Sequence, residues 1–408
     1  MSTEPVSTIR DVTVAASQYL DTDEVLLFVG ARQAGKTTIL RQLEARLRER
    51  SESVHFLTLE DPDFLAALNA SPKRLFELVP IGRNERTTVL IDEVQYLDDP
   101  AQFLKYHYDV NRGAVRIIAT GSSAFDLDAK FTDSLAGRKR IFRVWTCSFR
   151  EFLRFLHRDD LAALDFSRTA STQRDDLRRA YEEYLTFGGY PRVILAPMAE
   201  KRMVLQDIAY SYVKKDIADA RIRYEEQFYK LLKILADQVG NLVNTTELAA
   251  TIGVSRAAIE HHLAIMQRSF HLALVRPFWS NVRKELTKMP KAYFYDLGLR
   301  NFFVGRFEGT ATRTDLGPLL ENAVFRQLLE HDTHDEIRFW RTTDQHEVDF
   351  VVGERAAYEV KAGSRPMRRS RYGAFIEAYP NIPLTFVTLD APTRGARAPS
   401  PTIAPWEA

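Results

Sequence analysis

Residues 25–38, VLLFVGARQAGKTT, join a short apolar run to a turn that contains glycine. The run 25–30 is typical of a buried strand that enters a turn, and the residues from Lys36 onward predict an amphipathic helix. Residues 30–38 match G-x-x-x-x-G-K-[ST] at every fixed position and lie between that strand and that helix. The backbone N–H groups of such a turn and the helix dipole both favour a bound phosphate. The sequence therefore predicts a phosphate-binding loop.

The loop motif also predicts individual roles. Lys36 is expected to reach the β- and γ-phosphates of ATP, and the Thr37 hydroxyl is expected to ligate Mg²⁺. A chance glycine turn before a helix is the alternative, and the flanking strand and helix argue against it. The residues predicted to bind ATP are Gly30, Gln33, Ala34, Gly35, Lys36, Thr37 and Thr38.

Two carboxylates follow a second apolar run, in the stretch VLIDE at 89–93. Asp92 is expected to hold the magnesium shell, and Glu93 is expected to polarise an attacking water as general base. A carboxylate at the end of a buried strand can also be structural, but its position downstream of Lys36 favours the catalytic interpretation. The intact Asp-Glu pair predicts ATP hydrolysis and not only ATP binding.

The first 150 residues alternate between predicted strands and helices. Strands are expected at 25–30, 54–60, 87–93 and 114–123, and helices from Lys36 and at 63–79 and 99–111. This alternation predicts the α/β class, with a mostly parallel sheet that has helices on both faces.

Two further residues of this region are candidates for the hydrolytic site. Ser122, in TGSS at 120–123, is expected to contact the γ-phosphate or orient water, although a helix cap or turn serine is nearly as plausible. Arg138, in LAGRKR at 135–140, is expected to meet the γ-phosphate of a neighbouring subunit and offset its charge. The alternative for Arg138 is an ordinary surface cation.

Beyond residue 150 the pattern becomes helical and then mixed. The segment 244–270 has a helix–turn–helix layout, with Thr245 or Thr246 as the first cap, Gly253 in the turn and Ser255 as the second cap. Two strands around a basic wing at 281–291 follow, and then a helix at 316–331 and several strands. The Pro- and Ala-rich end of the chain is expected to be a flexible tail.

Composition limits the class of protein. Lys and Arg total 56 and Asp and Glu total 55, so no global basic field indicates a nucleic-acid binder. The single cysteine, Cys147, excludes an internal disulfide framework and a multi-cysteine zinc site. No apolar stretch approaches the length of a membrane span, so we expect a cytoplasmic protein with no membrane partner.

The order of several motifs resembles the AAA+ ATPases of a large bacterial and archaeal group, whose ATPase precedes a C-terminal domain of unknown function. These motifs are GARQAGKTT, VLIDEVQYL, IIATGSS, LAGR, SFREF, FGGYP and YVKKD. The resemblance implies a P-loop AAA+ core at 1–150, a helical lid at 151–222 and a winged helix at 223–297. It also implies a homo-oligomer, as a ring or a higher assembly.

The last domain, predicted at 298–395 before a tail at 396–408, carries a set of carboxylates. Glu321 on a helix, Asp349 on a strand and Glu359-Val360-Lys361 on the next strand resemble the PD-(D/E)xK nuclease core, a restriction-endonuclease-like α/β fold. The resemblance implies a catalytic set of Asp349, Glu359 and Lys361, a metal at both carboxylates with Glu321 as auxiliary ligand, and a basic stretch 365–371 that faces DNA. Cross-strand salt bridges on a solvated hairpin are the alternative.

These features together predict an oligomeric, Mg²⁺-dependent ATPase that acts on a partner, most plausibly DNA. Contact with DNA is expected through Arg256, Arg283, Lys284 and Lys288. The alternative function is an ATP-gated protein-interaction switch whose nuclease-like domain is inactive. A nuclease whose ATPase only licenses cutting is the third possibility.

Overall fold

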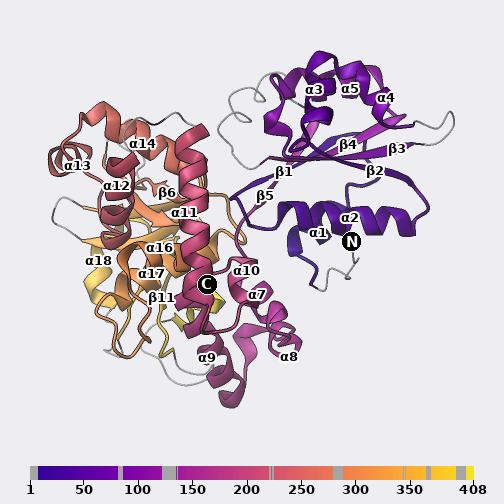
Figure 1. Cartoon of the computed structure of the whole chain (residues 1–408). Coiled ribbons are helices and arrows are strands. Elements are labelled where there is room, and N and C mark those ends of the chain that lie inside the picture. Colours follow the sequence, from indigo (N-terminus) through magenta and orange to yellow (C-terminus); the bar gives the residue numbers. More distant parts are fainter. Residues whose placement is uncertain are drawn as a thin grey trace. The chain divides into compact units, whose positions relative to one another are not determined.

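The computed structural model describes residues 8–80, 86–121, 135, 137–219, 222, 225–278, 288–342, 344, 346–363, 369–391 and 401–408. The chain divides into two compact units (Figure 1). Met1–Thr146 with Arg268–Phe270 belong to the first unit, and Cys147–Gln267 with His271–Ala408 to the second. The residues predicted to form the helical lid, the winged helix and the nuclease-like domain fall in the second unit, except for Arg268–Phe270.

The first unit is built on a five-stranded sheet in which every neighbouring pair is parallel. In spatial order the strands are β2 (Ser53–Thr58), β3 (Thr87–Asp92), β4 (Val115–Gly121), β1 (Val25–Gly30) and β5 (Lys139–Val144). All residues of β1, β3 and β4 are buried, which agrees with the apolar residues at the centres of these strands. The predicted parallel α/β sheet is confirmed.

Helices cover both faces of this sheet (Figure 1). On one face lie α1 (Asp11–Ser17) and α2 (Lys36–Glu49), and on the other α3 (Pro62–Ala70), α4 (Leu75–Leu78) and α5 (Pro100–Val110). The single helix predicted at 63–79 is wrong, because the chain breaks at Ser71, whose φ of −165° is extended. Pro72 follows, and proline disfavours helical backbone at the residue before it.

The second unit contains most of the helices of the chain. They are α7 (Phe149–Phe155), α8 (Asp159–Ala162), α9 (Ser171–Phe187), α10 (Pro191–Leu195), α11 (Lys201–Asp219), α12 (Glu225–Asp237), α13 (Thr245–Ile252), α14 (Arg256–Arg268), α16 (Leu297–Val304), α17 (Leu316–Leu328) and α18 (Gly373–Ala378). A capping box begins α7, since the Ser148 hydroxyl accepts from the Glu151 N–H and the Glu151 carboxylate accepts from the Ser148 N–H.

The predicted helix–turn–helix layout appears as α13 and α14. Gly253 ends α13 in the left-handed conformation, with φ of 80°, and Ser255 accepts a 3.2 Å hydrogen bond from the Ala258 N–H. The first cap is Asn244 and not Thr245 or Thr246, because its side chain accepts from the N–H groups at the start of α13. The antiparallel strands β6 (Leu272–Val275) and β7 (Lys291–Phe294) follow.

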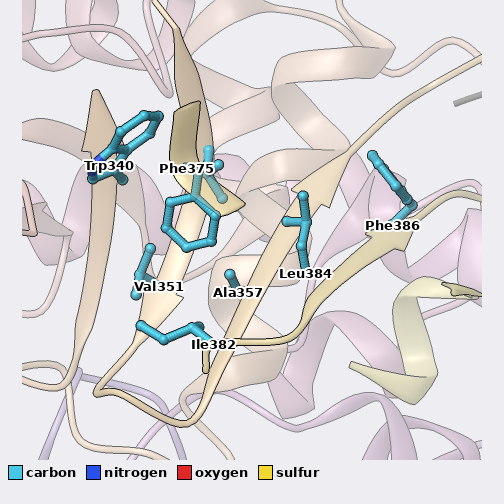
Figure 2. Close-up of a cluster of buried hydrophobic side chains, with 8 residues drawn as sticks. Trp340, Val351, Ala357, Phe375, Ile382, Leu384 and Phe386 are labelled. Atoms are coloured by element: carbon cyan, nitrogen blue, oxygen red, sulfur yellow. The ribbon is translucent and has the colours of Figure 1, made fainter. Parts of the chain in front are cut away.

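A second five-stranded sheet lies in this unit, in the order β12–β11–β10–β9–β8. The strands are β8 (Ile337–Arg341), β9 (Glu347–Val352), β10 (Ala356–Val360), β11 (Leu384–Val387) and β12 (Thr402–Ile403). Pairing is antiparallel from β8 to β10 and parallel from β10 to β12. Figure 2 shows a cluster on this sheet in which Trp340, Val351 and Ala357 pack with Phe375 of α18.

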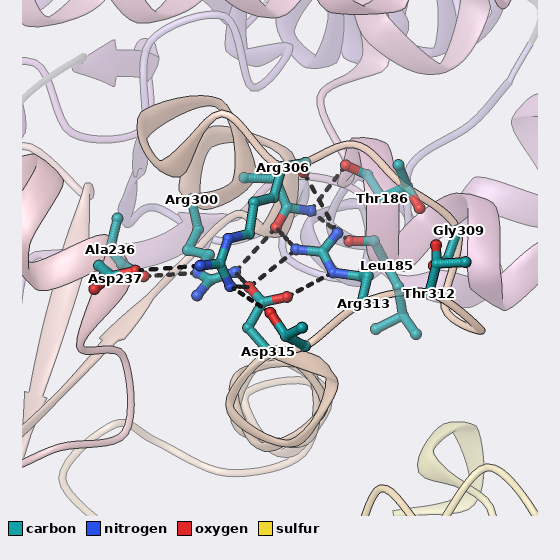
Figure 3. Close-up of polar contacts among 12 residues, drawn as sticks. Leu185, Thr186, Ala236, Asp237, Arg300, Arg306, Gly309, Thr312, Arg313 and Asp315 are labelled. Atoms are coloured by element: carbon teal, nitrogen blue, oxygen red, sulfur yellow. Dashed lines mark hydrogen bonds and ion pairs between the residues drawn. The ribbon is translucent and has the colours of Figure 1, made fainter.

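A buried ionic network precedes α17 and joins it to two other helices (Figure 3). Arg313 Nε lies 2.9 Å from Asp315, while Arg300 also pairs with Asp315 and donates a 2.7 Å bond to the Ala236 carbonyl. Burial raises the pKa of Asp315, but hydrogen bonds from Arg313 and Arg300 outweigh it and hold that pKa well below its usual range. The network fixes the start of the helix that carries Glu321.

The end of the chain differs from the predicted flexible tail. Residues 401–408 include β12 and a short 3-10 helix, and Trp406 is only 2% exposed. The Trp406 ring lies 5.2 Å from the ring of Tyr181, and Glu407 pairs with Arg174 at 2.8 Å. Burial of the indole outweighs the Pro- and Ala-rich composition that suggested disorder.

Candidate functional site

The predicted phosphate loop connects the buried end of β1 to α2. Gln33 and Gly35 adopt positive φ values of 58° and 97°, which turn the backbone at the N-terminus of α2. The Lys36 ammonium lies 3.0 Å from the Gly30 carbonyl and 2.9 Å from the Ala31 carbonyl, so it is held inside the loop. This arrangement places a cation and the positive end of a fourteen-residue helix at one point, as a phosphate requires.

Gly30 has a packing role that the motif alone does not reveal. A Cβ atom at this position would lie 2.0 Å from the Val144 carbonyl oxygen. Gly30 and Val144 are register partners in β1 and β5. The residue is therefore glycine because the neighbouring strand passes too close for a side chain.

The predicted magnesium ligands meet at the carboxyl end of β3. The Thr37 hydroxyl donates a 2.7 Å hydrogen bond to Oδ2 of Asp92. The Thr120 hydroxyl on β4 donates to the other oxygen of the same carboxylate and accepts a 2.9 Å hydrogen bond from the Glu93 N–H. Sequence analysis favoured Ser122 in this segment, but that residue lies outside the described residues. Thr120 therefore joins the site, and only the tertiary structure reveals its partners.

Glu93 lies directly after β3 in the left-handed region, with φ of 61° and ψ of 48°. This conformation is uncommon for a residue with a side chain and is often found at functional sites. The Gln95 side-chain amide donates to the Glu93 carboxylate. The turn thus holds the predicted general base in a defined orientation beside Asp92.

The oxygen donors of this site fit a magnesium ion. Thr37 Oγ1 and Asp92 Oδ2 are hard ligands within 2.7 Å of each other, at the mouth of a phosphate loop. Magnesium sites in such proteins use few protein ligands and complete their shell with water and phosphate. Thr37 and Asp92 would therefore hold the ion together with the nucleotide.

Arg10, which sequence analysis did not identify, contacts the same loop. Its guanidinium is buried and donates a 2.7 Å hydrogen bond to the Ala34 carbonyl and a 2.9 Å bond to the Trp145 carbonyl. The nearby Thr13 hydroxyl donates to Gln42 on α2 at 2.8 Å. Arg10 thereby links the phosphate loop to the end of β5, an arrangement that no local motif encodes.

Arg138 and the phosphate loop of the same subunit lie at opposite ends of the strands. Its carbonyl accepts from the N–H of Val25, the first residue of β1, whereas the loop follows Gly30 at the other end. Gly30 is five residues along β1 from Val25, so the two ends of the strand are roughly 17 Å apart. The Arg138 Nε pairs with Asp109 at 2.8 Å, and the side chain remains one-third exposed. Arg138 therefore cannot serve the nucleotide of its own subunit.

The C-terminal carboxylates surround a lysine that sequence analysis missed. Lys291 of β7 is 2% exposed, and its ammonium lies 3.1 Å from Glu321 and 2.5 Å from Glu347. The Tyr293 hydroxyl also donates to Glu321. Sequence analysis placed Lys291 only at the end of the basic wing 281–291, because nothing local to β7 shows that it faces α17 and β9.

The predicted catalytic set on β9 and β10 is held by other contacts. The Asp349 carboxylate accepts a 2.8 Å hydrogen bond from the Val360 N–H, and Lys361 pairs with one oxygen of Glu359. The Tyr372 hydroxyl also donates to the buried Glu359 carboxylate. Burial raises the pKa of Asp349 and of Glu359, and nearby Glu321 raises both further.

These residues do not form a metal cage. Within the described ranges, no three carboxylate, imidazole or thiolate side chains are gathered closely enough to hold a metal ion. Glu321, the predicted auxiliary ligand, accepts hydrogen bonds from Lys291 and Tyr293. Asp349, Glu359 and Lys361 lie close together, and Glu321 lies near them while it contacts Lys291 and Tyr293.

The predicted DNA-contacting residues are only partly described. Arg256 on α14 is exposed but pairs with Glu260 at 2.8 Å. The negative charge of Glu260 weakens the attraction of Arg256 for a DNA phosphate. Arg283 and Lys284, and residues 365–368 of the basic stretch, lie outside the described residues. No helix in the described ranges is long and apolar enough to span a bilayer.

Three protein-family models match the chain. Residues 22–153 match an AAA domain, residues 178–309 match a domain of unknown function (DUF8612), and residues 316–387 match another domain of unknown function (DUF4143). The first match covers β1 to β5 and both halves of the phosphate site. Together with the geometry above, it supports a P-loop AAA+ ATPase core in the N-terminal unit. Neither of the other descriptions names a nuclease.

Proteins similar to most of the chain occur in distant organisms. An uncharacterized protein of Haemophilus influenzae is 25% identical over 348 residues, which are 82% of this chain and 81% of that protein. The uncharacterized protein Rv2008c of Mycobacterium tuberculosis is 24% identical over 376 residues, 90% of this chain and 77% of that protein. The ORC2 protein of Aeropyrum pernix aligns with a TM-score of 0.39 at 12% identity and covers 64% of this chain and 85% of that structure. A structural likeness this distant says nothing about activity.

Proposed function

We propose that the N-terminal unit hydrolyses ATP with Mg²⁺. The observation that carries this proposal is the hydrogen-bonded set Thr37–Asp92–Thr120–Glu93, which lies at the mouth of the phosphate loop. It joins two sequence-distant halves of one site. A loop that only bound phosphate would need neither the positioned Glu93 nor its anchoring to Thr120.

Each residue has a separate role in this proposal. Lys36 and the N–H groups at the start of α2 bind the β- and γ-phosphates. Glu93 accepts a proton from the attacking water. The hydrogen bond from the Glu93 N–H to Thr120 fixes the backbone position from which the Glu93 side chain extends. Magnesium, when bound, would neutralise charge on the phosphate oxygens. Thr37 and Asp92 orient the ligand sphere through their mutual hydrogen bond.

We further propose that hydrolysis drives action on DNA by an oligomer of this chain. The helix–turn–helix of α13 and α14, the basic residues that flank it and the basic stretch 365–371 support this partner. Binding of the full chain to duplex DNA should weaken steeply as salt rises, because phosphate contacts release counterions. A flat salt dependence, or no binding at low salt with and without ATP, would contradict DNA as the partner.

A second candidate is an ATP-gated protein-interaction switch with an inactive nuclease-like domain. Two observations favour it: Arg256 is paired with Glu260, and Glu321 is held by Lys291. This candidate keeps the ATPase and changes only the partner. Salt-dependent binding of the full chain to duplex DNA separates the two, since the switch predicts no such binding.

A further inference from the structure

The carboxylates around Lys291 come from two elements that are distant in sequence. Glu321 lies on α17 and Glu347 on β9, and both reach the ammonium of Lys291 on β7. The second oxygen of Glu347 lies 3.2 Å from Arg341 of β8. One lysine thus joins a hairpin strand to a helix and to a second sheet.

Protein groups crowd the carboxylate of Glu321. A Cβ atom on Gly240 would lie 3.1 Å from a Glu321 oxygen, and Gly240 has φ of 81°. The Tyr293 hydroxyl donates to the same carboxylate, and the Lys291 ammonium lies 5.4 Å from the centre of the Phe339 ring. Glu321 therefore lies among protein groups that already contact its carboxylate, although 16% of its side chain remains exposed.

The charges in this region nearly balance without a metal. The carboxylates are Glu321, Glu347, Asp349 and Glu359. Lys291, Arg341 and Lys361 pair with all of them except Asp349, which accepts from the Val360 N–H. Buried carboxylates need a nearby positive charge, because an unpaired buried charge is costly. Here protein cations supply what a metal ion supplies in a metal-dependent site.

We propose that the Lys291 ammonium is a built-in counter-cation that stands in place of a divalent metal among the C-terminal carboxylates. It also fastens the β6–β7 hairpin to α17 and β9. This inference concerns the second unit and goes beyond the proposed ATPase. It holds or fails independently of ATP hydrolysis.

The first test compares the nucleotide-free full chain with its Lys291→Met variant. Removal of one partner from a buried ion pair leaves the other charged, so the unfolding midpoint of the variant should fall by roughly 10 °C. Mn²⁺ should raise the midpoint of Lys291→Met and leave that of the wild type unchanged. Lys230→Met, which breaks an exposed pair with Glu226, is the matched control and should show neither effect.

Direct measurement of Mn²⁺ binding by electron paramagnetic resonance completes the test. Lys291→Met should bind one more Mn²⁺ than the wild type, and an added Asp349→Asn should remove that ion, which separates it from any ion at Thr37 and Asp92. If Lys291→Met does not fold, Lys291→Met/Glu321→Gln removes one charge of each sign and should recover most of the lost midpoint. The proposal is overturned if the wild type binds a Mn²⁺ ion that the Glu359→Gln variant does not bind. It is also overturned if a folded Lys291→Met gains no ion, or if the double variant is no more stable than the single one.

Discussion

The Thr37 hydroxyl donates a 2.7 Å hydrogen bond to Oδ2 of Asp92, although 55 residues separate them in sequence. Thr37 belongs to the first turn of α2, and Asp92 is the last residue of β3. The bond joins the phosphate loop to the strand end that carries the proposed general base. Because Asp92 also accepts from Thr120, its carboxylate is fixed from two sides.

We expect Thr120→Val to impair ATP turnover more than ATP binding. Valine preserves the shape of the side chain but leaves the Glu93 N–H and one oxygen of Asp92 without their partner. A buried group without its hydrogen bond costs about 1–3 kcal/mol, which corresponds to roughly a 10- to 100-fold loss in kcat. Steady-state hydrolysis gives kcat and KM separately. Thr88→Val is the control, because Thr88 of β3 is buried like Thr120 but contacts Arg116 and not the site. An equal loss of kcat in both variants would contradict the role of Thr120.

Arg10→Ala should weaken ATP binding through the shape of the phosphate loop. The guanidinium fixes the Ala34 carbonyl at 2.7 Å, so its loss frees the loop residue next to Gly35. Hydrogen bonds from a charged donor are worth about 1.5–3 kcal/mol, and we expect KM for ATP to rise roughly tenfold or more with a smaller change in kcat. Arg10→Lys should recover part of the affinity, since it retains a buried donor. Unchanged KM in a folded Arg10→Ala protein would show that the contact is dispensable.

If Arg138 acts on the nucleotide of a neighbouring subunit, Arg138→Ala should lose turnover while its affinity for ATP changes little. Mixing Arg138→Ala with Lys36→Ala subunits should restore some activity, because one interface then pairs an intact arginine with an intact loop. Arg140→Ala is a matched control, since Arg140 lies on the same edge and pairs with Glu24 at 2.9 Å. Asp109→Ala tests the structural alternative. If it reproduces the Arg138→Ala defect, or if verified mixed oligomers show no rescue, the trans role is wrong.

His107 should make the stability of the first unit depend on pH. Burial lowers the pKa of His107 to about 4. Its ring contacts the Pro72 carbonyl at 3.0 Å and packs edge-on against the ring of Phe103. An unfolded histidine titrates near 6.5, so the unfolded chain binds more protons between these values and stability falls as pH drops from 6.5 to 4. The loss attributable to His107 is about 3 kcal/mol at most. Urea unfolding at several pH values should show a shallower pH dependence for His107→Gln, and identical slopes would contradict this assignment.

The sequence predicts those parts of the site whose partners are near in the chain. The loop 30–38 carries its own turn and helix start, and the strand before Asp92 is a plain apolar run, so both halves of the nucleotide site are visible locally. Burial also explains why the parallel sheet is predictable, because the central strands are buried on both faces and their middle residues are mostly apolar.

Contacts made across the fold are not predictable in this way. Arg10 reaches Ala34 and Trp145, and Lys291 reaches Glu321, through packing that no single segment encodes. The same limit explains the tail, where Trp406 finds an aromatic pocket although the surrounding composition suggested disorder. A role inferred from motif position, such as metal ligation by Glu321, does not reveal that a cation distant in sequence pairs with that carboxylate.

The most direct test of the proposed ATPase is ATP binding and hydrolysis by Glu93→Gln, measured beside the wild type and Lys36→Ala. Glutamine keeps the shape of the side chain and its contact with Gln95 but cannot accept the proton from water. We expect Glu93→Gln to bind ATP as tightly as the wild type while turnover falls at least roughly 100-fold, and Lys36→Ala to lose binding. Hydrolysis by Glu93→Gln at the wild-type rate, in protein free of contaminating ATPase, would contradict the proposed catalytic site.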